Sequence, residues 1–285
     1  MAAATTVGLG DPLVDPPGAK VDIIFVRGIR SDQANEQSST TAWPPSSLTQ
    51  NCGNARVSNF TYQYTLNDFY PESHHTGCDI DTHSKNLLDS LEARTKHGAA
   101  GRSIIFVARD LAGLVCANAL SHDGVVVSNT RGLVFIDTPF EGNALKWTKV
   151  AKELPVFQGL NIPSNLKERS SKLIEVHKKL LEYLGTKRED PLAIRYFCEN
   201  SDIFTPSTLY SSDALEEISD ESYEIVAQVL REWVDELSKT PPKSQGSATA
   251  AILIITKRFT TFLEWSQGAL QALLLMESIS EARLW

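Results

Sequence analysis

The sequence is poor in cysteine and has no long apolar run, and each deficit excludes a class of protein. Its four cysteines form no CxxC pair and are too sparse for a disulfide scaffold, so we expect a reducing compartment, the cytoplasm. No run of about 18 apolar residues could span a bilayer. The N-terminus also lacks the basic segment and apolar core of a secretory signal. We therefore expect no integral membrane segment.

An excess of basic residues is missing as well. The formal net charge is −8 at pH 7, which provides no basic surface for a phosphate backbone, so nucleic acid is not an expected partner. The sequence has no glycine-rich P-loop, and the adjacent His74 and His75 have no further ligands at the spacing of a metal site. We expect neither a metal nor a cofactor.

What the sequence does contain is an alternation of strands and helices. Apolar, β-branched runs predict strands at 21–28, 55–64, 102–110, 130–140 and 192–200. Apolar residues at helical spacing predict helices at 81–98, 111–124, 164–185 and 213–239. This alternation predicts the α/β class, with a doubly wound and mostly parallel sheet.

The chain divides into three expected parts. Residues 1–20 predict an irregular lead-in, residues 21–239 an α/β domain with a helical lid at about 145–190, and residues 240–285 a linker and a C-terminal helix. The apolar stripe of that helix favours docking on the body or on a second subunit, which would give a homodimer. Attachment to a membrane surface is the alternative, but Lys257 and Arg258 supply little basic charge for it.

The stretch IIFVARDLAGLVCANAL, residues 104–120, has the pattern of a nucleophile elbow without its nucleophile. In α/β-hydrolases the elbow reads G-x-S-x-G, where small residues permit a strained turn between strand and helix. Ala108, Ala112 and Gly113 preserve the small residues here, while Asp110 occupies the serine position. The pattern predicts a retained turn with altered chemistry.

Segments beyond the elbow support a specific resemblance. They are VDIIFVRG, WPPSSL, HSKNLLDSLEA, SIIFVARDLAGLVCANAL and TRGLVFIDTPFEG. In this order they resemble the fungal α/β-hydrolase-like serine esterase domains, which are related to serine-active-site-containing and lipase-like proteins and often precede NACHT modules. That family usually reads VDIVFVHGL, WPRDLL, HAKNLL, IIFVGHSLGGLVCKQAL and RGIIFLGTPHRG. The resemblance covers residues 20–238, is most diagnostic at 102–142, and implies the α/β-hydrolase fold.

The departures from this family fall on its functional positions. Arg27 replaces the histidine after the first strand, and Arg109 and Asp110 replace the histidine and serine of the elbow. Asp137 and Phe140 replace the glycine and histidine of GTPH. The resemblance therefore implies a hydrolase fold with a degenerate catalytic triad.

A missing histidine argues against hydrolysis. The family's catalytic histidine should follow the fifth strand, but no histidine occurs after His177. A serine triad also needs the hydroxyl proton that Asp110 lacks. Dehalogenases and epoxide hydrolases use an aspartate nucleophile, but they still need a histidine to activate water. Hydrolysis through Asp110 is thus the least favoured mechanism.

Three charged residues are expected at the centre of the site. The loop after the first strand lies beside the elbow in this fold, so we predict an ion pair between Arg27 and Asp110, with Arg109 as a further member. Such a pair either fills an inactive site, or anchors a substrate carboxylate or polarises a carbonyl.

Other groups are expected to line a small-molecule site. The backbone amides of Ile29 and Leu111 are candidates for an oxyanion hole, since backbone donors do not depend on side-chain identity. Asp137 either faces the pocket or caps the next turn, and we favour the cap. Glu199 holds the place of the family's triad acid or is a loop carboxylate. Three aromatic residues line the pocket or belong to the core: Trp43, Phe140 and Trp265.

Two functions follow from these expectations, with hydrolysis through Asp110 as a third. The first is a repurposed enzyme that cyclises or isomerises an apolar natural-product intermediate. Such a step, a [4+2] closure for example, needs a folded substrate and a polarising group but no nucleophile. The second is a catalytically inactive, esterase-like interaction or signalling module. We favour the repurposed enzyme.

Overall fold

The computed structural model describes residues 7–30, 43–65, 68–69, 79–95, 101–139, 171–185, 192–198, 215–217 and 223–239. Several predicted features lie outside these ranges. They are Phe140, Glu199, Trp265, most of the predicted lid, and the predicted C-terminal helix.

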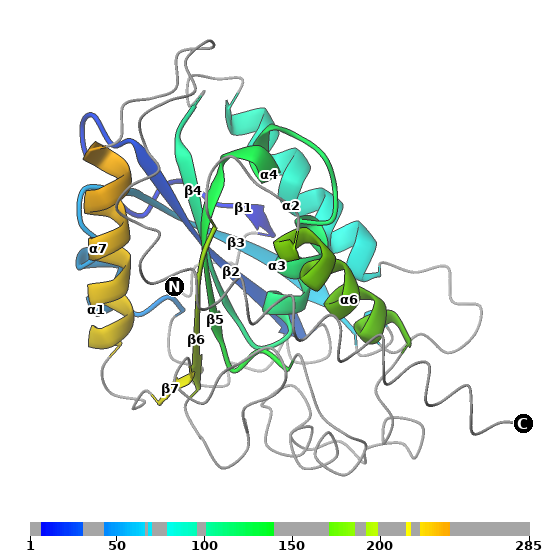
Figure 1. Ribbon diagram of the computed structural model, residues 1–285. Helices are drawn as coiled ribbons and strands as arrows, with labels where there is room; N and C mark the ends of the chain where they lie inside the picture. Colours follow the sequence, from blue (N-terminus) through cyan, green and yellow to red (C-terminus); the bar gives the residue numbers. More distant parts are fainter. Residues whose placement is uncertain are drawn as a thin grey trace, which may run out of the picture.

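A seven-stranded sheet forms the centre of the molecule (Figure 1), with the order β1-β3-β2-β4-β5-β6-β7. The strands are β1 (Gly8–Leu9), β2 (Val21–Arg30), β3 (Arg56–Tyr64), β4 (Ser103–Arg109), β5 (Thr130–Ile136), β6 (Ala193–Cys198) and β7 (Leu215–Glu217). The edge strand β1 is antiparallel to β3, and all other neighbours are parallel. With a sharp strand–turn–helix after β4, this arrangement is the α/β-hydrolase fold, which confirms the predicted fold class.

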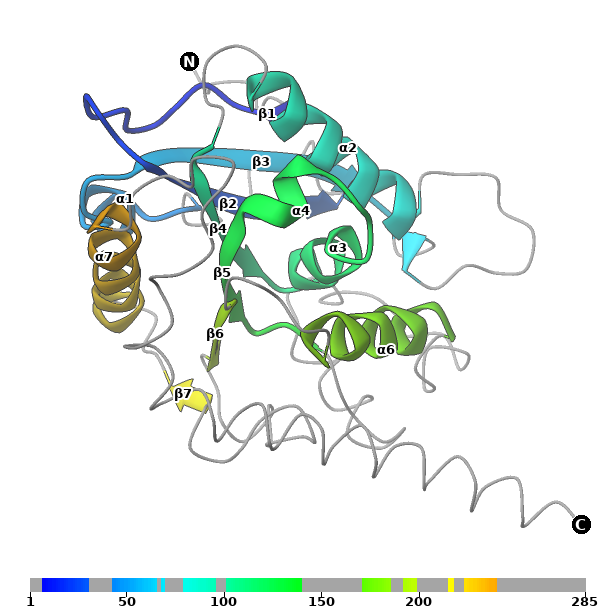
Figure 2. The same cartoon turned by 45° about the horizontal axis from the view of Figure 1, so that its top comes forward.

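Helices cover both faces of the sheet. The short α1 (Ser46–Gln50) and α7 (Glu224–Lys239) lie on one face, as Figure 1 shows. The other face carries α2 (Ile80–Arg94), α3 (Ala112–Ala119), α4 (Val125–Asn129) and α6 (Ser171–Gly185), which are separated clearly in Figure 2. Each face has its own apolar core. Buried on both sides, the central strands are continuous apolar runs rather than alternating ones, as parallel strands require.

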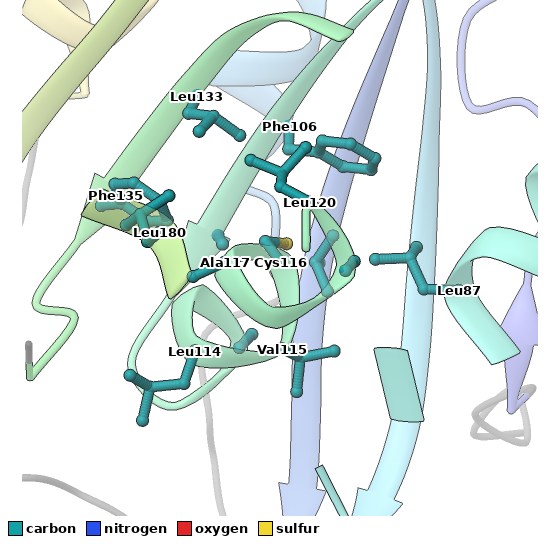
Figure 3. Close-up of a cluster of buried hydrophobic side chains, with 14 of the residues drawn as sticks. Leu87, Phe106, Leu114, Val115, Cys116, Ala117, Leu120, Leu133, Phe135 and Leu180 are labelled. Atoms are coloured by element: carbon teal, nitrogen blue, oxygen red, sulfur yellow. The ribbon is translucent and has the colours of Figure 1, made fainter. Parts of the chain in front are cut away.

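Helix α3, which follows the elbow, is the most deeply buried helix of its layer. All of its residues are buried, and all except Asn118 are apolar or small, so its apolar surface is not confined to a stripe. Leu87 of α2 and Leu180 of α6 approach it from the helical layer, and Phe106 and Phe135 from the sheet (Figure 3). This packing fixes the start of α3, and therefore the elbow, relative to the strands.

Two predictions of irregular or helical structure at the sheet edges were wrong. Within the lead-in, Gly8 and Leu9 pair with Thr61 and Phe60 as strand β1, which is too short to produce a periodic pattern. Residues 215–217, predicted as helix, form β7 beside β6, and α7 begins only at Glu224. Pairing with a sheet edge here overrides the helical propensity of Leu-Glu-Glu.

The described part of the predicted lid is a helix of the core layer. The residues of its stripe, Leu173, Val176 and Leu180, are fully buried in the same apolar core as α3. The helical periodicity was therefore predicted correctly, but α6 packs beside α3 in the helical layer on one face of the sheet and does not form a lid. An amphipathic stripe specifies that a face is buried and leaves open what covers it.

Candidate functional site at the elbow

A strained turn joins β4 to α3 where the sequence predicted it. Asp110 has a φ of 55°, in the left-handed region that Asp and Asn adopt more readily than other residues with a Cβ. Backbone hydrogen bonds hold the turn: the Asp110 N–H donates to the Ile136 carbonyl at 2.9 Å, and the Gly113 N–H to the Asp110 carbonyl at 3.2 Å. The elbow is therefore specified by its backbone and does not depend on a serine.

Close packing explains why Gly113 remains a glycine. A Cβ atom at this position would lie 2.1 Å from Oγ1 and 2.3 Å from Cγ2 of Thr138. Thr138 follows β5 and is itself buried. The first turn of α3 can approach β5 this closely only without a side chain at residue 113.

The elbow belongs to a row of residues along the carboxyl edge of the sheet. Gly28 pairs with Tyr62, and the registers continued by two residues from β2 to β4 and by one residue from β4 to β5 bring Asp110 and Asp137 level with them. These four residues, Tyr62, Gly28, Asp110 and Asp137, are here called the edge row. Asp137 repeats the conformation of Asp110 with a φ of 51°, and its N–H donates to the Phe197 carbonyl at 3.0 Å. Two adjacent strands thus end in the same left-handed aspartate, and Asp137, predicted at the site, lies beside Asp110.

The three predicted charged residues come together at the edge row. Nε of Arg109 lies 3.8 Å from Oδ2 of Asp110. Burial lowers the pKa of Arg27, the like charge of Arg109 lowers it further, and Asp110 acts in the opposite direction. Arg109 therefore forms the ion pair with Asp110, and Arg27 acts through its charge. The sequence had predicted Arg27 as the partner of Asp110, with Arg109 as a further member of the group.

The Arg109 side chain is held by aromatic residues on the α7 face of the sheet. Its Nη1 donates to the Tyr223 hydroxyl at 3.0 Å, and its guanidinium carbon lies 5.5 Å from the centre of the Trp43 ring. Trp43 also makes edge contacts with Phe25 and Tyr223. Trp43 thus packs with Arg109, and its contact with a substrate stays a prediction.

The predicted oxyanion amides lie on either side of the elbow. Leu111 directly follows Asp110 and caps the start of α3. Ile29 lies in the part of β2 that pairs with β3 beyond the last pairing of β2 with β4. At the level of Ile29, β4 no longer runs beside β2, because its chain has already turned into the elbow. The two amides are placed at the same end of the sheet, and their role in binding an oxyanion stays a prediction.

Sequence reasoning missed a cluster next to the elbow on β3 and α2. Nε2 of His83 lies 2.9 Å from Oδ2 of Asp68, and both residues are buried. The Tyr62 ring packs 4.5 Å from the His83 ring, centre to centre. Burial would raise the pKa of Asp68, but hydrogen bonds from His83 and Thr65 outweigh it and the pKa is lowered. The only sequence signal was the alternation of β3, which places Tyr62 on the same face as Phe60.

Two further kinds of site were searched for in the described ranges. No three His, Cys, Asp or Glu side chains there are arranged to hold a metal ion. Of the helices within those ranges, none has both the length and the apolar character needed to cross a bilayer.

Comparison with known proteins gives low sequence similarity and the same fold. No family model matches the chain. Protein SERAC1 from Homo sapiens is 24% identical over 192 residues, which are 59% of this chain and 29% of that protein. Protein SERAC1 from Mus musculus is 23% identical over the same length. The chain thus spans less than a third of the curated relatives that it matches.

Solved structures with a similar arrangement are α/β-hydrolase-fold enzymes. A structure of AqDC, described as recognising and cleaving the ring of the Pseudomonas quinolone signal, has a TM-score of 0.42 at 10% identity and covers 83% of this chain and 98% of its own. Est1E from Butyrivibrio proteoclasticus has a TM-score of 0.39 at 13% identity and covers 80% and 92%. The strand order and the elbow, rather than these scores, define the fold.

Proposed function

We propose that this chain is a non-hydrolytic enzyme of the α/β-hydrolase fold, and that it cyclises or isomerises an apolar natural-product intermediate beside Arg27 and Asp110. A pericyclic closure of the [4+2] type is one such reaction. Assignment to a fungal, secondary-metabolic setting belongs to the same proposal.

The observation that supports the proposal most is the content of the elbow. The turn that presents a nucleophile is intact, with Asp110 at a φ of 55°, but it presents a carboxylate beside two arginines. A carboxylate has no hydroxyl proton to give to a base, so the serine mechanism has no starting point. Fixed charges at a preorganised turn can still polarise a bound carbonyl without forming a covalent bond.

The histidines also fit this proposal. Hydrolysis of an ester formed on Asp110 would need a histidine to activate water. No histidine follows His177, and His83 is buried with its Nε2 in contact with Asp68. Cyclisation or isomerisation needs no such base, because the substrate rearranges without loss or gain of water.

Metabolite analysis tests the proposal. In the source organism, deletion of the gene should cause the accumulation of a compound with the same mass as the lost product but a different retention time. The purified protein should convert that compound into the product. A panel of esters should show no turnover with the wild-type chain or with Asp110→Ser.

Two results would overturn the proposal in different directions. Ester hydrolysis that Asp110→Asn abolishes would establish an aspartate nucleophile. An unchanged metabolite profile after deletion would favour the catalytically inactive interaction module.

A further inference from the structure

Helix α7 carries a second apolar row beside the one that faces the sheet. Its buried residues Val226, Leu230 and Val234 recur every fourth position and belong to the apolar core on that face. The residue before each of them is also apolar, and the pattern continues for one more turn. This second row, here called the flank row, consists of Ile225, Val229, Trp233 and Leu237. Residues four positions apart lie on one side of a helix, so the flank row is a continuous apolar strip.

The flank row is only partly covered. Ile225 is 44% exposed, and the other three residues are partly buried at the edge of the core. A Cβ atom on Gly132 of β5 would lie 2.8 Å from Cε3 of Trp233, so the row lies on the side of α7 toward β5. Among the described helices only α1 shares this face of the sheet with α7 (Figure 1). It contacts the opposite side of α7, where Nη1 of Arg231 donates to the Asn51 carbonyl at 3.3 Å.

A second, polar row borders the flank row on its solvent side. One position further back along the helix lie four exposed residues, here called the acidic row: Glu224, Gln228, Glu232 and Glu236. Over its whole length α7 has four acidic and two basic residues, which gives a formal charge of −2. A partner that fits this side of α7 is therefore apolar along one strip and basic beside it.

The chain that continues from α7 has these two properties. Residues 240–285 follow Lys239 directly and lie outside the described ranges. Within 249–263, apolar residues recur at helical spacing, namely Ile252, Ile255, Phe259 and Phe262. The charged residues of the same segment are Lys257 and Arg258, both basic. The segment is thus complementary to α7 in its apolar pattern and in its charge.

The connection is long enough for this segment to return along α7. Residues 240–248 span up to about 30 Å when extended, and the axes of packed helices lie about 8–10 Å apart. From Leu237 back to Ile225 the flank row is about 18 Å long, and a helix of residues 249–263 would be about 22 Å long. An antiparallel helix of this length therefore covers the whole row.

We propose that residues 249–263 dock as an antiparallel helix on the flank row of α7 in the same chain. The apolar stripe of the segment covers the flank row, and its two basic residues lie beside the acidic row. The far end of the segment then lies near Ile225, two residues after Tyr223, whose hydroxyl accepts a hydrogen bond from Arg109. The docked segment thus supports the end of α7 that holds Arg109. This inference does not depend on the proposed function, because it concerns the outer side of α7 and no substrate.

Hydrogen–deuterium exchange of the full chain, read by mass spectrometry, tests the proposal. In the wild-type chain the amides of 249–263 should exchange slowly, because an isolated helix of this length is marginal in water and docking stabilises it. Ile225→Asp places a charge in the flank row but lies in the first turn of α7, where a carboxylate favours the helix. It should speed exchange of the segment at least about tenfold and leave exchange within α7 unchanged. Phe259→Asp leaves α7 itself untouched and should have the same effect.

Two control variants match these changes. Val125→Asp introduces the same charge in the first turn of α4, at a residue that is 46% exposed on the other face of the sheet. Thr261→Asp introduces it in the segment at a position outside the apolar stripe. In both controls the segment should exchange like that of the wild-type chain.

Three results would overturn the proposal. Fast exchange of the segment in the wild-type chain would show that it is not docked. Slow exchange that Ile225→Asp leaves unchanged would show that it docks on a different surface. Slow exchange that becomes fast on dilution of the chain would identify a second copy as the partner, because only docking between chains depends on concentration.

Discussion

Substitution of Asp110 should separate the strain of the elbow from the charge of its side chain. At a φ of 55°, a residue with a Cβ costs roughly 1–2 kcal/mol relative to glycine, with Asp and Asn at the lower end of that range. The ion pair with Arg109 spans 3.8 Å between side chains that are 22% and 28% exposed, which limits its value to about 0–1 kcal/mol.

These two contributions predict an order of stability. Asp110→Asn keeps the backbone preference and loses the ion pair, so the free energy of unfolding should fall by up to about 1 kcal/mol. Asp110→Gly loses the same pair but removes the strain, and it should lie about 1 kcal/mol above the Asn variant. Asp110→Val adds a β-branched side chain in a forbidden region and should lie about 1–2 kcal/mol below the Asn variant.

Equilibrium urea denaturation at pH 7 measures this series. Repeating it in 1 M salt should bring Asp110→Asn closer to the wild-type chain, because exposed ion pairs are screened. Asp123→Gly is the matched control, since Asp123 is exposed and is not among the residues with positive φ. That variant should gain no stability. A Val variant as stable as the Gly variant would refute the assignment of strain to the elbow.

Three further changes test the packing and charge around the site. Gly113→Ala should destabilise the fold by about 1–3 kcal/mol despite its better helix propensity, because of the contact with Thr138, and Thr138→Ala should restore part of the loss in a double-mutant cycle. Asp22→Asn leaves the buried Arg56 guanidinium without its carboxylate and should lower the midpoint of urea denaturation by the equivalent of about 3–5 kcal/mol. The pKa of Asp68 is lowered in the folded state, so its ionised form stabilises the fold above the unfolded pKa near 3.8, and this stabilisation is lost as the pH falls through the folded pKa. Asp68→Asn should therefore flatten the dependence of the free energy of unfolding on pH between pH 5 and pH 2.

The fold could be predicted from the sequence because its central elements carry strong local patterns. Strands β2, β4 and β5 contain continuous apolar runs, β3 alternates, and the helices between the strands have apolar residues at helical spacing. The elbow could be predicted because small residues at fixed spacing mark a turn that few other structures need. Strand β7 could not, since its three residues are specified only by the neighbouring edge of β6.

The site was predicted less completely than the fold, for a related reason. Asp110, Arg27 and Arg109 could be proposed as site residues because they replace residues at recognisable positions. Which arginine pairs with Asp110 depends on side-chain direction: Nε of Arg109 lies 3.8 Å from Oδ2 of Asp110, while its Nη1 donates to Tyr223, directly before α7. That contact joins residues 114 positions apart, which no local pattern encodes.

The backbone of the elbow explains how its chemistry can change while its shape is kept. The N–H of Asp110 continues the parallel ladder by donating to Ile136, and the N–H of Asp137 does the same to Phe197. The start of α3 is fixed by close contact between Gly113 and Thr138. None of these interactions uses the side chain of residue 110. The fold therefore tolerates any side chain at that position that accepts a positive φ, and an aspartate accepts it more readily than most. A carboxylate can thus occupy the elbow position, where it lies 3.8 Å from Nε of Arg109.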